Sequence, residues 1–330
     1  MHAVTLIPGD GIGPEVTDAA MRVVEASGVG ITWDRVEAGL PALAAHGDPL
    51  PDAVIESIVK NRVALKGPLS SPPEFTSVNV RLRQLFVLYA NIRPIKSYRG
   101  VRCLHNGVDA VIFRENIEEF YTAEERKTSE GVELTAKMTR VGCERIIRAA
   151  FAYARRNGRK RVSLAHKANI LKTFYGLFLG TGQAVAREYP DIAFDDFIID
   201  NFGQQLVMRP QRFDVVVLTN LLGDIMSDVA AGLVGGLGLA PGANIGGDYA
   251  IFEAVHGSAP DIAGKGIANP CAVILSAAMM LRHLGETVAA DRIEQAIETV
   301  LAEGAHVTAD IKPGSICTTR EMTDAIIAKL

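Results

Sequence analysis

The sequence predicts an α/β fold with a largely parallel sheet. Short apolar runs alternate with longer amphipathic segments along the chain, which is the rhythm of strands connected by helices. The apolar runs also lack the strict polar–apolar alternation of a strand with one face in water, so we expect strands that are covered on both faces. At 330 residues, the chain is long enough for two domains.

The predicted elements follow in order from composition and punctuation. A strand at Val4–Ile7 leads into a helix at Pro14–Ala26, where Pro14 suits the first turn and Gly28 lies just past the end. Further helices are predicted at Cys143–Arg156 and at Ala272–Leu284, which Gly285 terminates. The other predicted strands are Val63–Leu65, Asp109–Phe113, Arg161–Ala165, Ala193–Ile199 and Phe213–Leu218.

Two segments break this rhythm. Tyr121–Thr139 is polar with loose alternation, which predicts an exposed hairpin or arm. Leu233–Gly247 is rich in Gly and Pro, and this composition predicts a loop near a domain crossing.

Composition and charge exclude several classes of protein. The chain has 34 Lys and Arg against 38 Asp and Glu, so it lacks the basic excess of a general nucleic-acid binder. Its four cysteines have no metal or redox spacing, which is typical of idle thiols in a reducing compartment. No signal-peptide pattern and no apolar run of membrane-spanning length is visible. We therefore expect a cytoplasmic protein that binds neither nucleic acid nor membrane.

A glycine cluster, Gly9–Val16, follows the first strand and opens the first helix. Its spacing lacks the third glycine of a dinucleotide fingerprint, so a tight strand-to-helix turn remains an equal interpretation.

An acidic segment, Asn220–Asp228, follows the strand that ends at Leu218. If it is helical from Gly223, Asp224 and Asp228 lie four residues apart and face the same way. Paired carboxylates suit Mg²⁺ or Mn²⁺, which prefer hard oxygen ligands. Asp200 also ends an apolar strand, where ligands of open α/β sheets bind. The alternative is that these aspartates are helix caps and solvated turns.

Several basic and proton-bearing side chains lie at or near strand ends. Lys167 and Tyr121 could each exchange protons, or be ordinary surface residues. Arg114 follows a buried-strand pattern and should meet carboxylates, either of a ligand or of a neighbouring glutamate. Arginines in otherwise apolar segments are Arg81, Arg83, Arg93 and Arg114, and the glutamates that could pair with the last are Glu115, Glu118 and Glu119.

Taken together, these segments resemble the β-decarboxylating dehydrogenases, the family of isocitrate, homoisocitrate and 3-isopropylmalate dehydrogenases. The resemblance covers nearly the whole chain, is most specific over Asn220–Gly246, and is nearest to an NAD-dependent isocitrate dehydrogenase. It rests on IPGDGIGPEV, KGPLSSP, LYANIRP, FRENIEEFY, HKANILK, NLLGDIMSDVAAGLVGGLGLAPGANIG and HGSAPDIAGKGIANP.

The resemblance implies a two-domain fold that is not a Rossmann fold. The first, cofactor-binding domain would be discontinuous, comprising Met1–Ile95 and Pro241–Leu330. The second would be Lys96–Ala240, with the Tyr121–Thr139 arm clasping a second copy in a homodimer. The active site would lie between the domains and be completed by the partner subunit.

The same resemblance implies roles for individual residues. Tyr121 would donate a proton and Lys167 would accept one across the dimer, near Asn169. Asp224, Asp228 and, from the other subunit, Asp200 would hold Mg²⁺ or Mn²⁺. The substrate's carboxylates would be clamped by Arg83, Arg93 and Arg114, and Lys66, Ser70 and Ser71 would form a loop at the cleft.

The predicted cofactor is NAD. The segment His256–Asn269 matches the loop along which the family's adenosine lies, with His256, Gly257 and Asn269 as contacts. NADP-dependent relatives carry Lys-Tyr where this chain has Asp261-Ile262, and a carboxylate there accepts bonds from ribose hydroxyls but repels a 2′-phosphate. Asp261 could also cap a helix.

The predicted reaction is the NAD-linked oxidative decarboxylation of isocitrate to 2-oxoglutarate and CO₂, a step of the tricarboxylic acid cycle. Ser77 and Asn79 match residues that grip isocitrate's γ-carboxylate, whereas isopropylmalate enzymes place an apolar residue there. The short loop Pro72–Thr76 departs from the family, and the chain from Ala165 onward equally resembles homoisocitrate dehydrogenases. Homoisocitrate is therefore the alternative, followed by 3-isopropylmalate or another malate derivative. The complete catalytic set argues against a non-catalytic regulatory subunit.

Overall fold

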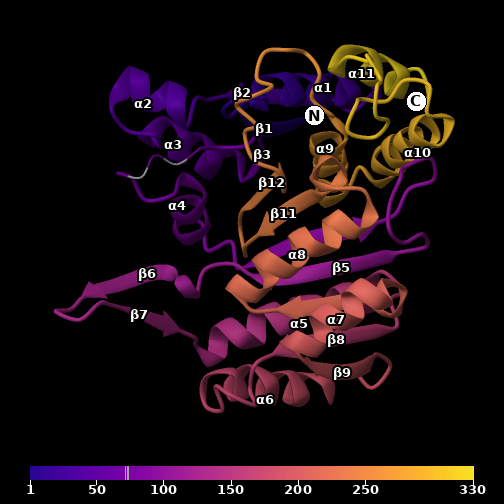
Figure 1. The fold of residues 1–330 in the computed structure, drawn as a ribbon. Coiled ribbons are helices and arrows are strands. Elements are labelled where there is room, and N and C mark those ends of the chain that lie inside the picture. The colour runs from indigo at the N-terminus through magenta and orange to yellow at the C-terminus, as the bar shows by residue number, and fades with distance from the viewer. Residues whose placement is uncertain (71, 73) are drawn as a thin grey trace.

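The protein is described by a computed structural model that covers residues 1–70, 72 and 74–330. Within these residues, one ten-stranded sheet runs in the order β2-β1-β3-β12-β11-β4-β5-β10-β8-β9, and β6 and β7 form a separate hairpin (Figure 1). The strands are β1 (His2–Ile7), β2 (Ile31–Arg35), β3 (Val63–Lys66), β4 (Ala90–Lys96), β5 (Asp109–Glu115), β6 (Glu119–Lys127), β7 (Val132–Lys137), β8 (Arg161–His166), β9 (Ala193–Ile198), β10 (Val215–Leu218), β11 (Pro241–Ile245) and β12 (Ala250–Ala254).

Helices pack on both faces of this sheet. They are α1 (Gly13–Ala26), α2 (Leu40–His46), α3 (Asp52–Asn61), α4 (Val78–Leu85), α5 (Arg140–Arg156), α6 (Phe174–Ala186), α7 (Ile199–Met208), α8 (Asn220–Val234), α9 (Cys271–His283), α10 (Thr287–Glu303) and α11 (Thr319–Ile327), with short 3-10 turns η1 (Pro210–Arg212) and η2 (Leu237–Leu239). Among the residues described, no helix combines the length and the apolar character needed to cross a membrane.

The predicted α/β class is confirmed, and the centre of the sheet adds a feature that the sequence did not indicate. The outer pairs of strands are parallel, whereas β4 is antiparallel to both β5 and β11, and β11 is antiparallel to β12. The chain therefore changes direction in the middle of one continuous sheet.

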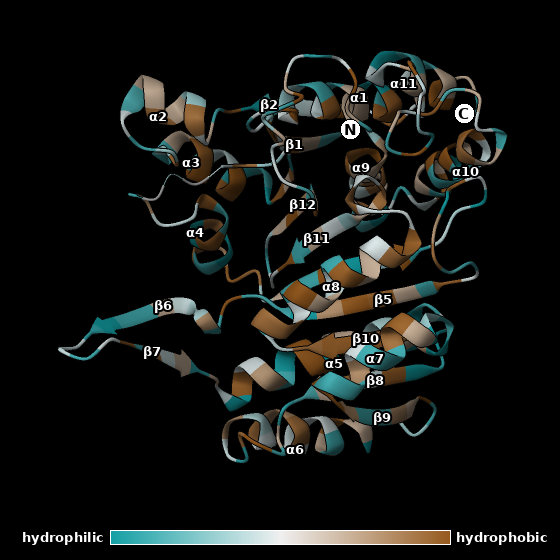
Figure 2. Cartoon of the chain, viewed as in Figure 1, coloured by the Kyte–Doolittle hydropathy of each residue, from teal (hydrophilic) through white to brown (hydrophobic). Residues whose placement is uncertain are grey.

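Burial on both faces explains why the strands lack polar alternation. In β5, Val111 and Phe113 pack with α5 and α6, whereas Ala110 and Ile112 pack with α7 and α8. Figure 2 shows the contrast between buried and projecting strands: β5 and β10 have hydrophobic colouring, and the projecting strand β6 has hydrophilic colouring.

The prediction of a loop at Leu233–Gly247 was wrong over Pro241–Ile245, which form the buried central strand β11. Proline usually argues against a central strand, but Pro241 is the first residue of β11, where its lack of a backbone N–H is tolerated. Close packing favours glycine at position 242, since a Cβ there would lie 3.0 Å from the carbonyl oxygen of Glu253. The predicted arm is confirmed as the hairpin β6–β7, which projects away from the sheet (Figure 1).

The glycine cluster after β1 is a close-packed turn. Gly9 and Gly11 have φ values of +82° and +59°, and a Cβ on them would lie 2.3 Å from the carbonyl oxygen of Pro68 and 1.9 Å from that of Ser258. The glycines therefore let three loops meet at one edge of the sheet, as the turn interpretation required.

Strands from residues 1–96 and 241–254 occupy one half of the sheet, and strands from residues 109–218 occupy the other. This order is compatible with a discontinuous first domain, Met1–Ile95 with Pro241–Leu330, and a second, Lys96–Ala240. Because the sheet is continuous across the junction, the division into domains stays a prediction.

Candidate active site

A cavity of about 130 Å³ lies against the central strands β4, β11 and β12. Helix α4 contributes Asn79 and Arg83 to its wall, and β4 contributes Arg93. His256 and Gly257, in the loop after β12, line it as well. The fold thus brings three of the predicted substrate residues together with two of the predicted cofactor residues.

The cavity wall carries polar atoms that lack partners. Among the described residues, Asn79 Oδ1, Arg83 Nε and His256 Nε2 are buried without a hydrogen bond. Burial lowers the pKa of His256, so its ring is neutral at neutral pH. Because its Nδ1 lies 3.0 Å from the carbonyl oxygen of Gly257, Nδ1 carries the proton and Nε2 is an acceptor. Two acceptors and one donor are therefore available to a polar ligand in this cavity.

Arg114 and Arg93 converge on one aspartate beside this cavity. Arg114 is 1% exposed; it donates to Asn220 at 3.0 Å and pairs with Asp224. Arg93 pairs with Asp224 at 3.3 Å and with Asp228 at 3.1 Å. The interpretation of Arg114 as the partner of an adjacent glutamate was wrong, because the side chain crosses to α8 instead.

Tyr121 joins this cluster from the root of the arm. Its hydroxyl donates to Asp224, and its ring centroid lies 4.9 Å from the guanidinium carbon of Arg114. Burial raises the pKa of Tyr121, so the phenol keeps its proton at neutral pH. Tyr121 lies inside β6 rather than at the strand end where the sequence placed it.

Asp224 and Asp228 project from one side of α8, as the four-residue spacing predicted, since both contact Arg93. Burial opposes ionisation of both carboxylates. The charge of Arg114 and the hydrogen bond from Tyr121 nevertheless lower the pKa of Asp224. Burial and the charge of Asp224 raise the pKa of Asp228, so its negative charge is incompletely neutralised, a condition that a divalent cation would relieve.

The donor set for a metal ion is incomplete within one chain. Of the residues that the structure describes, no three His, Cys, Asp or Glu side chains gather as a metal site. Mg²⁺ prefers about six oxygen ligands, and Asp224 and Asp228 supply two carboxylates. These two residues fit such an ion provided that substrate, water or another chain supplies the remaining ligands.

Lys167 and Asp200 form a separate, exposed pair. Lys167 follows β8 and forms an ion pair with Asp200, whose side chain is 66% exposed. The hydrogen bond from Lys167 lowers the pKa of Asp200. Asp200 lies in the first turn of α7 rather than at a strand end, because β9 stops at Ile198. Asn169 is exposed beside them.

The remaining predicted substrate residue, Ser77, is the N-cap of α4 and makes no side-chain capping bond. Ser77 is not part of the cavity wall described above, whereas Asn79, two residues further along the chain, is part of it. Ser71 lies outside the described residues.

The predicted cofactor residues lie in two loops, one after β3 and one between β12 and α9. Ser70 donates its backbone N–H to Asp10 at 2.6 Å. Asp261 is exposed in a turn rather than a helix, and Ile262 packs on the large core. Asn269 is engaged in structure, since it accepts from the N–H of Cys271 at the start of α9.

Sequence reasoning missed the polar residues under the cavity. Glu253 accepts a salt bridge from Lys66 at 2.5 Å and faces Arg83 at 3.6 Å. Although burial opposes its ionisation, Lys66 and Arg83 lower the pKa of Glu253 to about 2. Asn91 and Asn244 lie beside it, nearly inaccessible to solvent. The available signal was a single polar residue inside each of the apolar runs YANI, GANI and AIFEA.

Comparison with known proteins finds relatives that match this chain over nearly its whole length. The family model described as isocitrate/isopropylmalate dehydrogenase matches residues 3–326. The isocitrate/homoisocitrate dehydrogenase of Thermus thermophilus is 49% identical, over 100% of this chain and 98% of that protein. The 3-isopropylmalate/3-methylmalate dehydrogenase of Methanocaldococcus jannaschii is 46% identical, over 100% and 99%.

A solved structure has the same fold over the whole chain. The crystal structure of isocitrate dehydrogenase from Methylococcus capsulatus matches with a TM-score of 0.97 and 55% identity, over 100% of this chain and 99% of that one.

Proposed function

Because the chain belongs to the isocitrate/isopropylmalate dehydrogenase family of decarboxylating dehydrogenases, we propose that it oxidises isocitrate to 2-oxoglutarate and CO₂ with NAD and Mg²⁺ or Mn²⁺. The family as a whole uses NAD or NADP together with a divalent cation. Substrate, cofactor choice and the metal are therefore the proposal, and the site's charge is the observation that carries it.

The charges around the cavity favour a trianionic substrate. Four cations face three carboxylates in the joined ion pairs of this site: Arg83, Arg93, Arg114 and Lys66 against Asp224, Asp228 and Glu253. Burial and the neighbouring guanidinium groups lower the pKa of Arg114 to about 9, so it stays charged at neutral pH. With a divalent cation added, the excess is about three positive charges, which three carboxylates balance and two do not.

Homoisocitrate is the second candidate, since it is also a tricarboxylate and the Thermus thermophilus relative is named for both substrates. A dicarboxylate such as 3-isopropylmalate would leave about one positive charge unbalanced and would place its apolar group against the unpaired oxygen of Asn79.

The chain's own residues account for the proton transfers. Lys167, with Asp200 or a water, would take the proton of the substrate's hydroxyl oxygen, once the lysine has passed its own proton to that carboxylate or water. Tyr121, protonated and hydrogen-bonded to Asp224, would deliver a proton to the carbon that loses CO₂. Arg93 and Arg114 would orient the substrate's carboxylates against α8. When bound, NAD would accept the hydride, and the divalent cation would supply positive charge at the substrate's hydroxyl and carboxylate oxygens.

We include a homodimer in the proposal, in which Lys167 and Asp200 serve the partner's site. Large apolar side chains are exposed on α7, on α8 and along the arm, as expected of surfaces that pair. They include Val207 (48%), Ile225 (50%), Val229 (38%), Val132 (64%) and Leu134 (47%).

A substrate and cofactor panel tests the proposal. Purified protein is assayed for NADH or NADPH formation with isocitrate, homoisocitrate, 3-isopropylmalate and tartrate, each with Mn²⁺. We expect isocitrate to give the highest kcat/KM, and NAD to exceed NADP at least about 100-fold because Asp261 opposes a 2′-phosphate. Faster turnover of 3-isopropylmalate, or comparable rates with NADP, would refute the corresponding part.

Asn79 provides a sharper test of substrate choice. Asn79→Leu should lower kcat/KM for isocitrate about 10- to 150-fold, because the Asn79 amide can turn its Nδ2 donor toward a bound carboxylate and leucine has no donor. Ser77→Leu is the matched control, since Ser77 lies outside the cavity wall and should change kcat/KM less than about threefold. Equal losses in the two variants would return Ser77 to the substrate site.

A further inference from the structure

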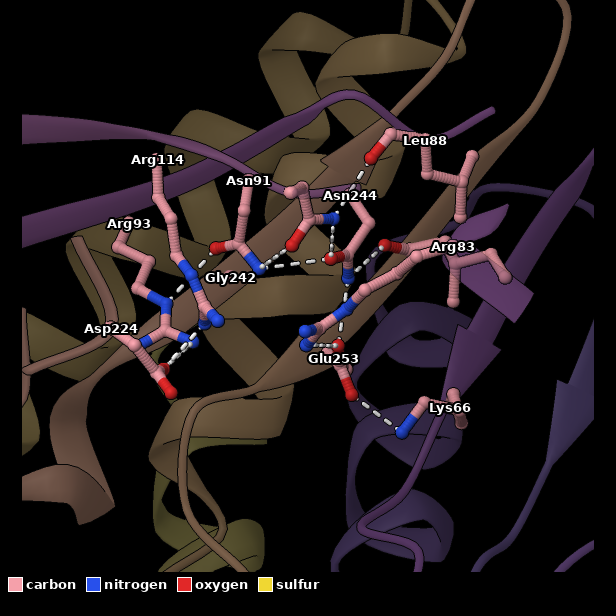
Figure 3. Close-up of polar contacts among 12 residues, drawn as sticks. Lys66, Arg83, Leu88, Asn91, Arg93, Arg114, Asp224, Gly242, Asn244 and Glu253 are labelled. Carbon is pink, nitrogen blue, oxygen red and sulfur yellow. Dashed lines mark hydrogen bonds and ion pairs between the residues drawn. The ribbon is translucent and has the colours of Figure 1, made fainter. Parts of the chain in front are cut away.

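A row of polar side chains crosses the middle of the sheet beneath the cavity. Neighbouring strands place Arg114 opposite Asn91 and Asn91 opposite Asn244. Glu253 lies on β12, the strand beside β11, and Lys66 lies opposite it on β3. Gly242, opposite Glu253, leaves the space above this row open to the cavity. Figure 3 shows these residues pointing toward one another from β3, β12, β11, β4 and β5.

The hydrogen bonds in this row have one possible direction. Arg93 Nε can only donate, so Asn91 must accept through Oδ1, at 2.9 Å. The Nδ2 of Asn91 then donates to Asn244 Oδ1, also at 2.9 Å. The Nδ2 of Asn244 is left to donate to Glu253, at 2.7 Å. A guanidinium at one end and a carboxylate at the other therefore fix the orientation of both amides.

This row of hydrogen bonds connects two cavity-lining arginines that have no hydrogen bond to each other. Arg93 lies at one end, and Glu253 at the other end faces Arg83 at 3.6 Å. Arg83 has little else to hold it, since its Nε is unpaired in the described part of the chain. Its orientation consequently depends on Glu253, and the orientation of Glu253 depends on Asn244 and Lys66.

We propose that Asn91, Asn244 and Glu253 are positioning residues that hold Arg93 and Arg83 in the orientations needed by the substrate's carboxylates, with Asn244 as the indispensable link. The inference rests on the proposed function only in that the ligand is a malate-type carboxylate. Arginine side chains lose much rotational freedom on binding, so fixing them beforehand raises affinity and aligns the substrate for reaction.

Asn116 supplies a matched control within the same network. It is as buried as Asn244 and donates to the carbonyl oxygen of Leu88 at 2.8 Å and to Asn244 Oδ1 at 2.9 Å. Its Oδ1 accepts weakly from Asn91 at 3.4 Å. It has no hydrogen bond to either arginine, and the path from Arg93 to Glu253 does not pass through it. Asn116→Leu therefore removes buried hydrogen bonds without interrupting that path.

The experiment compares Asn244→Leu with Asn116→Leu by thermal unfolding, by steady-state kinetics on whichever panel substrate the parent oxidises, and by calorimetric titration with malate. We expect similar losses in Tm. Only Asn244→Leu should raise KM and the malate Kd, by about 10- to 100-fold, with a smaller fall in kcat. Equal changes in the two variants, or an unchanged KM and malate Kd in Asn244→Leu, would overturn the proposal.

Two further arms keep the outcome decisive. If Asn244→Leu does not fold, Asn244→Ser, whose hydroxyl is too short to reach Glu253, is compared with Asn116→Ser. If the parent oxidises none of the panel, the proposed function fails, but the malate titration still tests positioning. A parent that does not bind malate would overturn the positioning role as well.

Discussion

Asp224 and Asp200, which the sequence analysis assigned to the same metal ion, differ sharply in their surroundings. Asp224 on α8 receives Arg93, Arg114 and Tyr121, all delivered by its own chain. Asp200 on α7 is 66% exposed and has Lys167 as its ion-pair partner. The half-buried cluster around Asp224 is therefore held in place by its own chain, which suits the binding of a charged ligand. An exposed ion pair contributes little to stability, so folding alone does not account for Lys167 and Asp200, and the pair remains available for the role proposed at a partner's site.

The largest expected effect tests whether Lys167 acts across a dimer. Lys167→Met should lower kcat by about 10²- to 10⁴-fold, as expected for loss of a proton-transfer group. If the sites are shared, mixing subunits of Lys167→Met with those of Asp224→Asn should restore about a quarter of the parent activity, since half the dimers then contain one intact site.

The control for this complementation mixes Asp224→Asn with Asp228→Asn, whose lesions lie on the same side of the site. We expect no recovery there. Recovery in the control, or none in the first mixture after verified subunit exchange, would show that Lys167 and Asp224 do not meet across an interface.

The next effect concerns the incompletely neutralised carboxylate in the buried cluster. Asp228→Asn removes a charge that burial and Asp224 disfavour, so the free energy of unfolding should stay the same or rise. Turnover at low Mn²⁺ should nevertheless fall at least about 100-fold, with partial recovery at high Mn²⁺. Manganese titrations of activity, together with urea unfolding, measure both quantities, and full activity at low Mn²⁺ would remove Asp228 from the metal site.

A smaller effect concerns the hydrogen bonds of Glu119, which connect the start of β6 to α8 and α6. Glu119, 1% exposed and with φ of +68°, accepts from Leu221 N–H at 2.7 Å in the first turn of α8 and from the Tyr175 hydroxyl at 2.7 Å. Glu119→Ala should destabilise the protein by about 2 kcal/mol, because these donors lose their acceptor.

Glu119→Gly is the matched control. It loses the same bonds but relieves the left-handed backbone, so it should be about 1 kcal/mol more stable than Glu119→Ala. Urea unfolding measures the difference. Equal stabilities would mean that the positive φ at Glu119 is not a strained feature.

A further effect is a pH dependence of stability at the root of the arm, which vanishes below the pKa window of a single carboxyl group. Burial raises the pKa of Glu115 from 4.5 to about 7, although backbone N–H groups of Glu118 and Ile117 oppose the shift. The folded state therefore binds this proton more tightly than the unfolded state, and Glu115 makes stability fall as pH rises from about 4.5 to 7. Glu115→Gln should remove this slope, gaining up to about 3 kcal/mol on the parent across that window. Parallel stability–pH curves for the two proteins would contradict it.

The sequence alone determined the layers of this fold and much of its site. Apolar runs such as Phe213–Leu218 predicted buried strands correctly, because burial on both faces leaves a continuous apolar pattern that does not depend on distant partners. The spacing of Asp224 and Asp228 predicted a shared helix face for the same local reason. Both patterns are set by residues within a few positions of each other.

Tertiary structure decided which charges meet and where the chain reverses. Arg114 and Asp224 are 110 residues apart, so no local pattern could choose Asp224 over the adjacent glutamates. Strand β11 was hidden because its Pro and Gly lie inside a strand, where Gly242 packs closely against β12, and do not mark a turn. The row from Arg93 through Asn91 and Asn244 to Glu253 exists because strands from both ends of the sequence become neighbours, and only that pairing gives each buried amide one orientation.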